Sequence, residues 1–230
     1  MSAPAAVHPL APRFAQGVTG VLCLEGLLFG QPAAVAVAFA LVAIALAAPR
    51  LSPVGWVFRR IAPPPQRMEP AAPVRFSQAL AVLFLGVALV LFAAGVPTAE
   101  WVLAGMVAAL ALLSALAGVC VGCEVYRLAL ARRGGGEGDV RGDLGLEGPG
   151  PWLVVLTAPG CARCEPAARE LEGLAGGPVA RVDIVRRPRA GRLPVRSVPA
   201  VLAVGSDGRV RALRAGRLAR RDLEAVAQAV

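Results

Sequence analysis

Residues 152–164 read WLVVLTAPGCARC. The first six residues are a continuous apolar run, which is typical of a short buried β-strand. Ala158 to Gly160 carry the Pro-Gly signal of a turn, and Cys161 and Cys164 follow as a C-x-x-C motif. Apolar residues then recur at helical spacing, at Ala167, Ala168, Leu171 and Leu174, until Gly176-Gly177. The stretch therefore predicts a strand, a tight turn and a helix that begins at the two cysteines.

The residues after this helix predict the rest of a small α/β domain over 151–230. Apolar runs bounded by turn residues indicate further strands, and the last apolar pattern is helical. We expect strands over 179–185, 200–204 and 209–213, a hairpin turn at Ser206-Asp-Gly208 and a final helix over 222–230.

The positions of the two thiols predict different chemistry for each. Unpaired N–H groups and the helix dipole lower the pKa of a thiol at a helix N-terminus and favour its thiolate. We therefore expect Cys161 to be the nucleophile and Cys164, one turn inside the helix, to resolve the mixed disulfide. We expect the Val198-Pro199 bond to be cis, with a backbone edge beside the thiol for an incoming strand.

These features occur in order over residues 152–230, as TAPGCARC, RSVPAVL, SDGRVRALRAG and a C-terminal helix. In this they resemble the thioredoxin superfamily. The resemblance implies a thioredoxin-like fold in which Cys161 is the attacking thiol, Cys164 the resolving thiol and Pro199 the cis-proline.

The sequence also departs from that family. Gly160 stands where a Trp is usual, Val155 where a buried Asp is usual, and Ala162-Arg163 where Gly-Pro is usual. The domain lacks the family's N-terminal strand and helix. We expect a minimal version without the Asp as a proton-transfer aid and with a shifted redox potential.

Cys161 and Cys164 could alternatively be two of the four ligands of a structural zinc site. Cys120 and Cys123 form a second C-x-x-C that could supply the other half. The separating segment, 124–160, exceeds the ~15–20 residues usual between zinc half-sites. We expect no metal and no cofactor.

Residues 134–150 read GGGEGDVRGDLGLEGPG. Such glycine-rich sequence with alternating charges predicts a flexible linker that builds no core, with an r.m.s. span of ~23 Å. A domain on this linker could bring its active thiol back to a membrane surface.

The chain before the linker predicts a four-helix membrane domain over 1–133. A span needs ~20 apolar residues, and apolar stretches occur at roughly 14–30, 33–48, 76–95 and 101–121. The first two stretches predict a helical hairpin broken at Gln31-Pro32, with a re-entrant pair as the alternative. Residues 53–61, PVGWVFRRI, predict a short interfacial helix.

The arginines predict the orientation of these helices, because basic residues stay on the cytoplasmic side. They lie before the first stretch, between the second and third, and after the fourth, whereas the loops 30–32 and 96–100 have none. We expect a multi-pass protein of the bacterial inner membrane with both ends and the α/β domain in the cytoplasm.

Four residues are unusual in the apolar half. Glu25, near Cys23, costs at least ~2.5 kcal/mol within a span, so it either faces the bundle interior or lies at the helix end. Cys120 and Cys123 are expected on one face at the cytoplasmic end of the fourth span, as a redox relay or as small packing residues. Cys123 is expected nearer the water and so to react with Cys161.

Residues 9–131 resemble a bacterial four-helix membrane family of unknown function, number 4395. The resemblance is in PLAPRFAQGV, PRLSPVGWVFR and, most of all, GVCVGCEVY. It supports the architecture and implies no activity.

The composition excludes several functions. Apolar residues are 57% and charged residues 17% of the chain, against ~45–50% and ~25% in average proteins. All 24 basic residues are Arg, and the only His is His8, which argues against Lys- and His-dependent catalysis. Despite the +9 charge, few aromatic residues are available to stack on bases, so we expect no nucleic-acid partner.

The leading hypothesis is a membrane-tethered thiol-disulfide oxidoreductase. Its partners would be the lipid bilayer and a thiol or disulfide protein client or reductant, with Cys120 and Cys123 as a possible relay for electron transfer. The alternatives are a sulfane-sulfur carrier with a persulfide on Cys161, coupled to a membrane transporter, and a non-catalytic membrane scaffold.

Overall fold

The computed structural model describes residues 6–132, 138–175, 179–187, 189–190, 193 and 195–230. These residues form two compact units. The helical unit comprises 10–63 and 73–126, and the sheet unit comprises the described parts of 1–9, 64–72 and 127–230. The chain thus crosses between the units more often than the predicted boundaries at 133 and 151 allow, because 64–72 belongs to the sheet unit.

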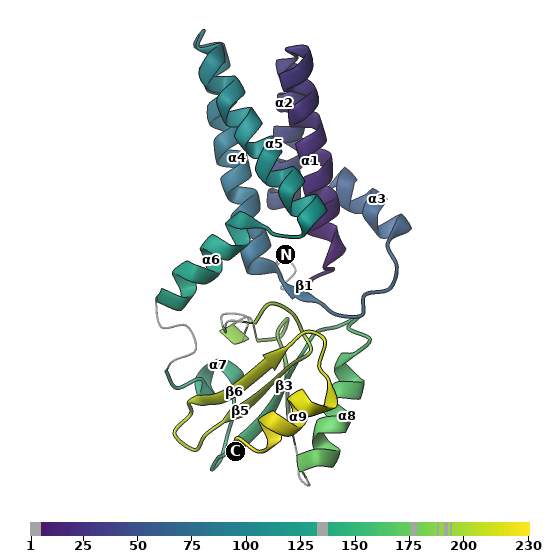
Figure 1. Cartoon of the computed structure of the whole chain (residues 1–230), viewed down its shortest axis with the longest axis vertical. Coiled ribbons are helices and arrows are strands. Elements are labelled where there is room, and N and C mark those ends of the chain that lie inside the picture. Colours follow the sequence, from purple (N-terminus) through teal and green to yellow (C-terminus); the bar gives the residue numbers. More distant parts are fainter. Residues whose placement is uncertain (1–5, 133–137, 176–178, 188, 191–192, 194) are drawn as a thin grey trace. The chain divides into compact units, whose positions relative to one another are not determined.

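The helical unit is built from helices separated by proline and glycine breaks (Figure 1). Proline lies at the start of three helices, where its missing N–H costs no hydrogen bond. The helices are α1 (Leu10–Phe29), α2 (Pro32–Ala47), α3 (Pro53–Ile61), α4 (Ala71–Ala93), α5 (Pro97–Ala117) and α6 (Val121–Arg132). The break at Gln31-Pro32 and the short helix α3 have the positions that the sequence predicts.

Small side chains let the helices of this unit approach closely. A Cβ on Gly20 of α1 would lie 2.7 Å from Leu112 of α5, which is closer than a carbon–carbon contact allows. Fully buried Cys23, Val35, Leu85 and Ala104 lie in one apolar cluster. Close packing of small residues is the way in which helices associate in lipid.

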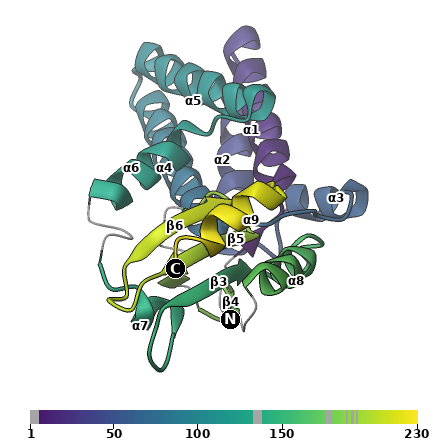
Figure 2. The ribbon, with the colours of Figure 1, turned by 60° about the horizontal axis from the view of Figure 1, so that its bottom comes forward.

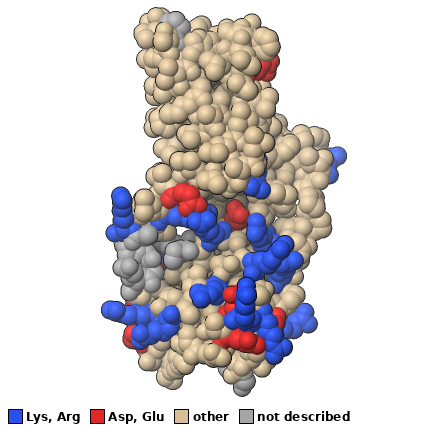
Figure 3. All heavy atoms as spheres, viewed as in Figure 1, with Lys and Arg blue, Asp and Glu red and all other residues tan. Residues whose placement is uncertain are grey.

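Two helices in the described part of the chain are long and apolar enough to cross a membrane, α4 and residues 98–117 of α5. Helix α2 is apolar but shorter, over Pro32–Ala47. The face of the helical unit seen in Figure 3 is almost free of charged side chains. These features favour membrane association of the chain.

The sheet unit contains a four-stranded sheet in the order β4-β3-β5-β6 (Figure 2). β3 runs parallel to β4 and antiparallel to β5, and β5 and β6 form an antiparallel hairpin. The strands are β3 (Trp152–Thr157), β4 (Ala180–Asp183), β5 (Ala200–Val204) and β6 (Val210–Ala215). Helices α8 (Cys164–Ala175) and α9 (Arg220–Ala227) follow β3 and β6.

Alternation along the strands gives the sheet two buried faces. Val155 and Val201 point to a cluster that includes Leu171 of α8 and Leu223 of α9. Val154 and Leu202 belong to the opposite cluster, which includes loop residues and Cys164. Both faces are therefore covered, and α8 is held in place with its N-terminus at the end of β3.

The prediction of a flexible linker over 134–150 is wrong for its second half. Val140 and Leu144 are 3% and 1% exposed and belong to the sheet's core. The short helix α7 (Arg141–Leu144) begins directly after Val140 and ends before Gly145. The Val140 N–H also donates to Gly208 O at 2.9 Å. The i, i+4 spacing of two apolar residues outweighs the glycine-rich composition, so the ~23 Å reach does not apply. Residues 134–137 lie outside the described residues.

Candidate functional site

Cys161 and Cys164 form a disulfide at the N-terminus of α8. Gly160, with φ +80°, makes the turn from β3, and the Cys161 N–H donates to Ala158 O at 3.3 Å. Cys164 is 4% exposed, whereas Cys161 is half-buried. An attacking reagent therefore reaches Cys161 more easily than Cys164.

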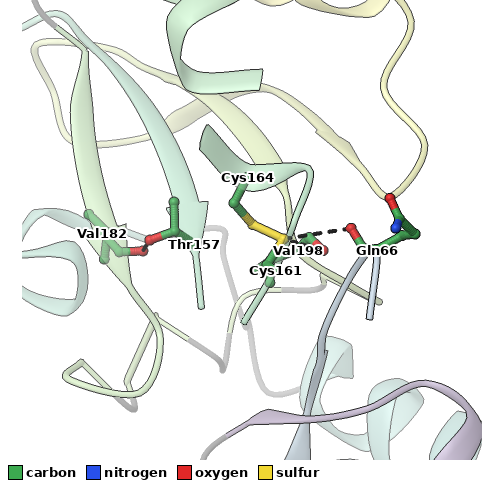
Figure 4. The surroundings of a disulfide bond; sticks show 6 residues. All are labelled: Gln66, Thr157, Cys161, Cys164, Val182 and Val198. Carbon is green, nitrogen blue, oxygen red and sulfur yellow. Dashed lines mark hydrogen bonds between the residues drawn. A yellow bond between two sulfur atoms is a disulfide. The ribbon is translucent and has the colours of Figure 1, made fainter. Parts of the chain in front are cut away.

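The sulfur of Cys161 faces two backbone carbonyl groups from segments far apart in the sequence (Figure 4). Its Sγ atom lies 3.7 Å from Val198 O and 3.9 Å from Gln66 O. The peptide bond between Val198 and Pro199 is cis. The site is thus built from the end of β3, the start of α8, the turn before β5 and a segment from the first half of the chain.

That segment, Pro64 to Pro70, was not expected at the site from the sequence. Met68 and Val198 form an antiparallel bridge, in which Met68 N–H donates to Val198 O at 3.1 Å and Val198 N–H to Met68 O at 2.8 Å. The Ala162 N–H, inside the C-x-x-C, donates to Pro65 O at 3.3 Å. The only sequence signal was the proline-rich run PPPQRMEP over 63–70, which favours extended backbone.

The other side of α8 is fixed by an exposed ion-pair network. Arg181 of β4 contacts Glu165 at 2.7 Å and Glu172 at 3.0 Å. These carboxylates raise the pKa of Arg181 through hydrogen bonds. Because both acidic residues lie on α8, the arginine ties the cysteine-bearing helix to the sheet edge.

The second C-x-x-C lies at a helix start, not within a continuous helix as predicted. Helix α5 ends at Ala117, Gly118 has φ +72°, and α6 begins at Val121. Cys120 therefore precedes the first turn of α6, and its Sγ accepts a hydrogen bond from Cys123 N–H at 3.3 Å. A left-handed glycine ends the helix that apolar periodicity alone predicts to continue.

Polar groups gather around the Cys120 sulfur. Gln16 Nε2 lies 3.5 Å and Ser77 Oγ 3.4 Å from it. A hydrogen bond with the Cys123 side chain, together with these groups and the Cys123 N–H, lowers the pKa of Cys120 to about 5 against the desolvating effect of burial. These contacts favour the thiolate form of Cys120, and Cys123, 5% exposed, is adjacent to it.

Cys120 lines a cavity of about 280 Å³ within the helical unit. Most of the wall is apolar, with Gln16, Ser77 and Ser114 among its polar residues. The Ser114 hydroxyl donates to Gln16 Oε1. Gly122 keeps this site compact, because a Cβ there would lie 2.9 Å from Ser77 Oγ.

The other two candidate residues of the apolar half do not form a site. Glu25 is exposed, so the bundle-interior interpretation is wrong and the helix-end interpretation fits. Cys23 is fully buried among apolar side chains. Among the described residues, Glu100 near the start of α5 carries the fully buried carboxyl group, and no hydrogen-bond partner reaches its oxygens. The sequence analysis places Glu100 in the loop 96–100, whereas in the structure α5 already begins at Pro97.

No metal-binding cluster occurs among the residues that the structure describes. Comparison with protein families places residues 7–131 in the domain of unknown function DUF4395. The chain belongs to this family. The match covers the helical unit, both cysteines of the C-V-G-C motif and the segment 64–72, and it ends before the four-stranded sheet. Searches of curated proteins and of solved structures find no match to the chain.

Proposed function

We propose that this DUF4395 protein is a membrane-tethered thiol-disulfide oxidoreductase that acts through Cys161 and Cys164. The observation that carries the proposal is the pair of cysteines at the start of α8, one accessible and one buried, beside the backbone edge of Val198. A helix N-terminus favours the thiolate that exchange requires. The resemblance of residues 152–230 to the thioredoxin superfamily supports the same assignment and gives Pro199 the role of the cis-proline.

Reduction of a client would take two balanced steps. The Cys161 thiolate attacks one sulfur of a client disulfide, which forms a mixed disulfide and releases one client thiolate. Cys164 then loses its proton and attacks Cys161 Sγ, which forms the Cys161–Cys164 disulfide and releases the second client thiolate. Two electrons pass to the client, and the same steps in reverse oxidise it.

Cys120 and Cys123 would exchange disulfides with this pair. The Cys120 thiolate attacks Cys161 Sγ and Cys164 leaves as a thiolate; Cys123 then loses its proton and attacks Cys120 Sγ, which releases Cys161. Cys120, with its lowered pKa and greater exposure, is a better attacking group than Cys123, which the sequence favoured. This exchange moves two electrons from Cys120 and Cys123 to Cys161 and Cys164.

The membrane arrangement is part of the same proposal. We propose four spans, α1, α2, α4 and α5, with both ends and the sheet unit in the cytoplasm of a bacterial cell. The length and apolar character of α4 and α5 support this, as does the absence of arginine from the loops 30–32 and 96–100.

Mass spectrometry of the cysteine states tests the proposed chemistry. The full-length protein is purified in detergent with and without dithiothreitol, alkylated and digested. We expect a reducible Cys161–Cys164 disulfide and a thiol on Cys120. A sulfur atom added to Cys161 would instead indicate the persulfide carrier, and Cys161 and Cys164 that stay reduced under an oxidising glutathione buffer would refute redox cycling.

A further inference from the structure

A segment from the first half of the chain pairs through its backbone with the residues beside Cys161. What this pairing means for the client of Cys161 rests on the function proposed above. Three main-chain hydrogen bonds hold Pro65 to Met68 in the site, two to Val198 and one from Ala162. They place Gln66 O close to the Cys161 sulfur. The segment thus lies where a client strand would have to lie for its sulfur to meet Cys161.

The segment is held through its main chain and through the Met68 side chain, which packs against the sheet's core. Gln66 and Arg67 are exposed, and the Gln66 side chain points away from the disulfide in Figure 4. Pro64, Pro65 and Pro70 have no N–H to donate. Met68 supplies both the N–H donor and the C=O acceptor that pair with Val198. Main-chain pairing of this kind accepts many sequences, because every residue except proline carries the same donor and acceptor.

The segment is also present at high local concentration. It connects α3, which ends at Ile61, to α4, which begins at Ala71. A strand tethered by a short loop competes at roughly millimolar effective concentration. A free client must therefore displace it to reach Val198.

We propose that residues 65–68 are a built-in, displaceable occupant of the Val198 edge beside Cys161, held where an extended, cysteine-containing client strand would pair. The client is a segment without regular structure, since only an unpaired strand offers its N–H and C=O groups. The occupant holds the Val198 edge until such a client displaces it.

Engineered cysteines test the occupancy. In the full-length chain with Cys23, Cys120 and Cys123 changed to Ser and with Cys164→Ala, Gln66→Cys or Arg67→Cys is added. Diamide, which accepts the two hydrogens released, should link Cys161 to the new thiol in one or both variants. Ser206→Cys is the control, because Ser206 lies two residues past the end of β5 (Ala200–Val204), and the residues of a strand rise ~3.3 Å each away from the Val198 end. No link at either position, or equal linking at Ser206, overturns the proposal.

A rate measurement tests the competition. Met68→Pro removes the N–H that pairs with Val198 O, and Ser206→Pro introduces proline at a turn position that accepts it. Each reduced protein, with Cys23, Cys120 and Cys123 changed to Ser, reacts with an unstructured peptide whose cysteine carries thionitrobenzoate. We expect the Met68→Pro protein to release thionitrobenzoate about tenfold faster, which corresponds to ~1.4 kcal/mol, and the Ser206→Pro protein to match the native rate.

The outcomes separate this proposal from the function on which it rests. An equal or slower rate in the Met68→Pro protein overturns the competition. Release by none of the proteins, together with a formed crosslink at position 66 or 67, refutes the proposed oxidoreductase while the occupancy stands.

Discussion

The protonation of Cys120 gives a prediction whose size follows from its contacts. A pKa of about 5 against an ordinary 9.0 makes the sulfur ~99% thiolate at pH 7 where an ordinary thiol is ~1%. The reaction rate at pH 7 does not reveal this, because nucleophilicity falls by ~0.4–0.5 log units per pKa unit and offsets ~100-fold of the gain. The pH profile does reveal it. Alkylation of Cys120 should be constant above pH 6 and fall below pH 5.

Changes at Cys123 should move this profile. Cys123→Ala removes the side-chain hydrogen bond that lowers the Cys120 pKa most. A hydrogen bond to a charged group contributes ~1.5–3 kcal/mol, which is ~1–2 pKa units. The midpoint should therefore rise by that amount. Cys123→Ser keeps a donor of similar size and should leave the midpoint low.

Iodoacetamide labelling of the detergent-solubilised protein between pH 4 and pH 9, quantified on the Cys120 peptide, measures these midpoints. Labelling of the native protein that keeps rising through pH 8 would refute the thiolate assignment. Equal midpoints in the Cys123→Ala and Cys123→Ser proteins would refute the role of the side-chain hydrogen bond.

Three further predictions follow from the described contacts. Gly118→Ala forces a Cβ into a left-handed backbone and against the guanidinium of Arg13. Thermal unfolding should therefore show a loss of stability of ~1 kcal/mol or more, and the midpoint of the Cys120 pH profile should rise. An unchanged midpoint would mean that the helix break at Gly118 does not lower the pKa of Cys120. Arg181→Gln removes two exposed ion pairs and should leave the urea unfolding midpoint nearly unchanged, whereas a clear fall of the midpoint would mean that the attachment of α8 depends on these pairs. With every native cysteine replaced, a single thiol placed at residues 94–96, between α4 and α5, should react with an impermeant maleimide in intact cells, and one placed at the exposed residues 147–149 should not. The reverse pattern would invert the orientation.

Local patterns in the sequence were sufficient to predict the strands around the first cysteine pair. The strands 152–157 and 200–204 were predicted with the bounds that β3 and β5 have, because apolar runs between turn residues are a short-range signal. Helix α3 was predicted over its full length for the same reason. The linker was misjudged because Val140 and Leu144 are only two apolar residues among many glycines, and their burial depends on the distant sheet.

The contacts of the candidate sites that could not be predicted from the sequence join residues far apart in the chain. The pairing of Met68 with Val198 joins residues whose separation no local pattern spans. The partners of Cys120, Gln16 and Ser77, come from two other helices. Glycine was the available signal for the break before Cys120, since Gly118 and Gly122 flank it, but the apolar periodicity of α5 favoured a continuous helix.

Trapping the exchange intermediate tests the central claim most directly. Cys164→Ala combined with Cys123→Ser removes both thiols that could resolve a Cys161–Cys120 disulfide, so Cys161 should stay linked to its partner. We predict that non-reducing digestion of this variant, purified after diamide treatment, yields a Cys161–Cys120 peptide pair, and that adding Cys161→Ser abolishes it. A Cys161 that is recovered only as a thiol, linked to neither Cys120 nor a client protein, would contradict the proposed oxidoreductase.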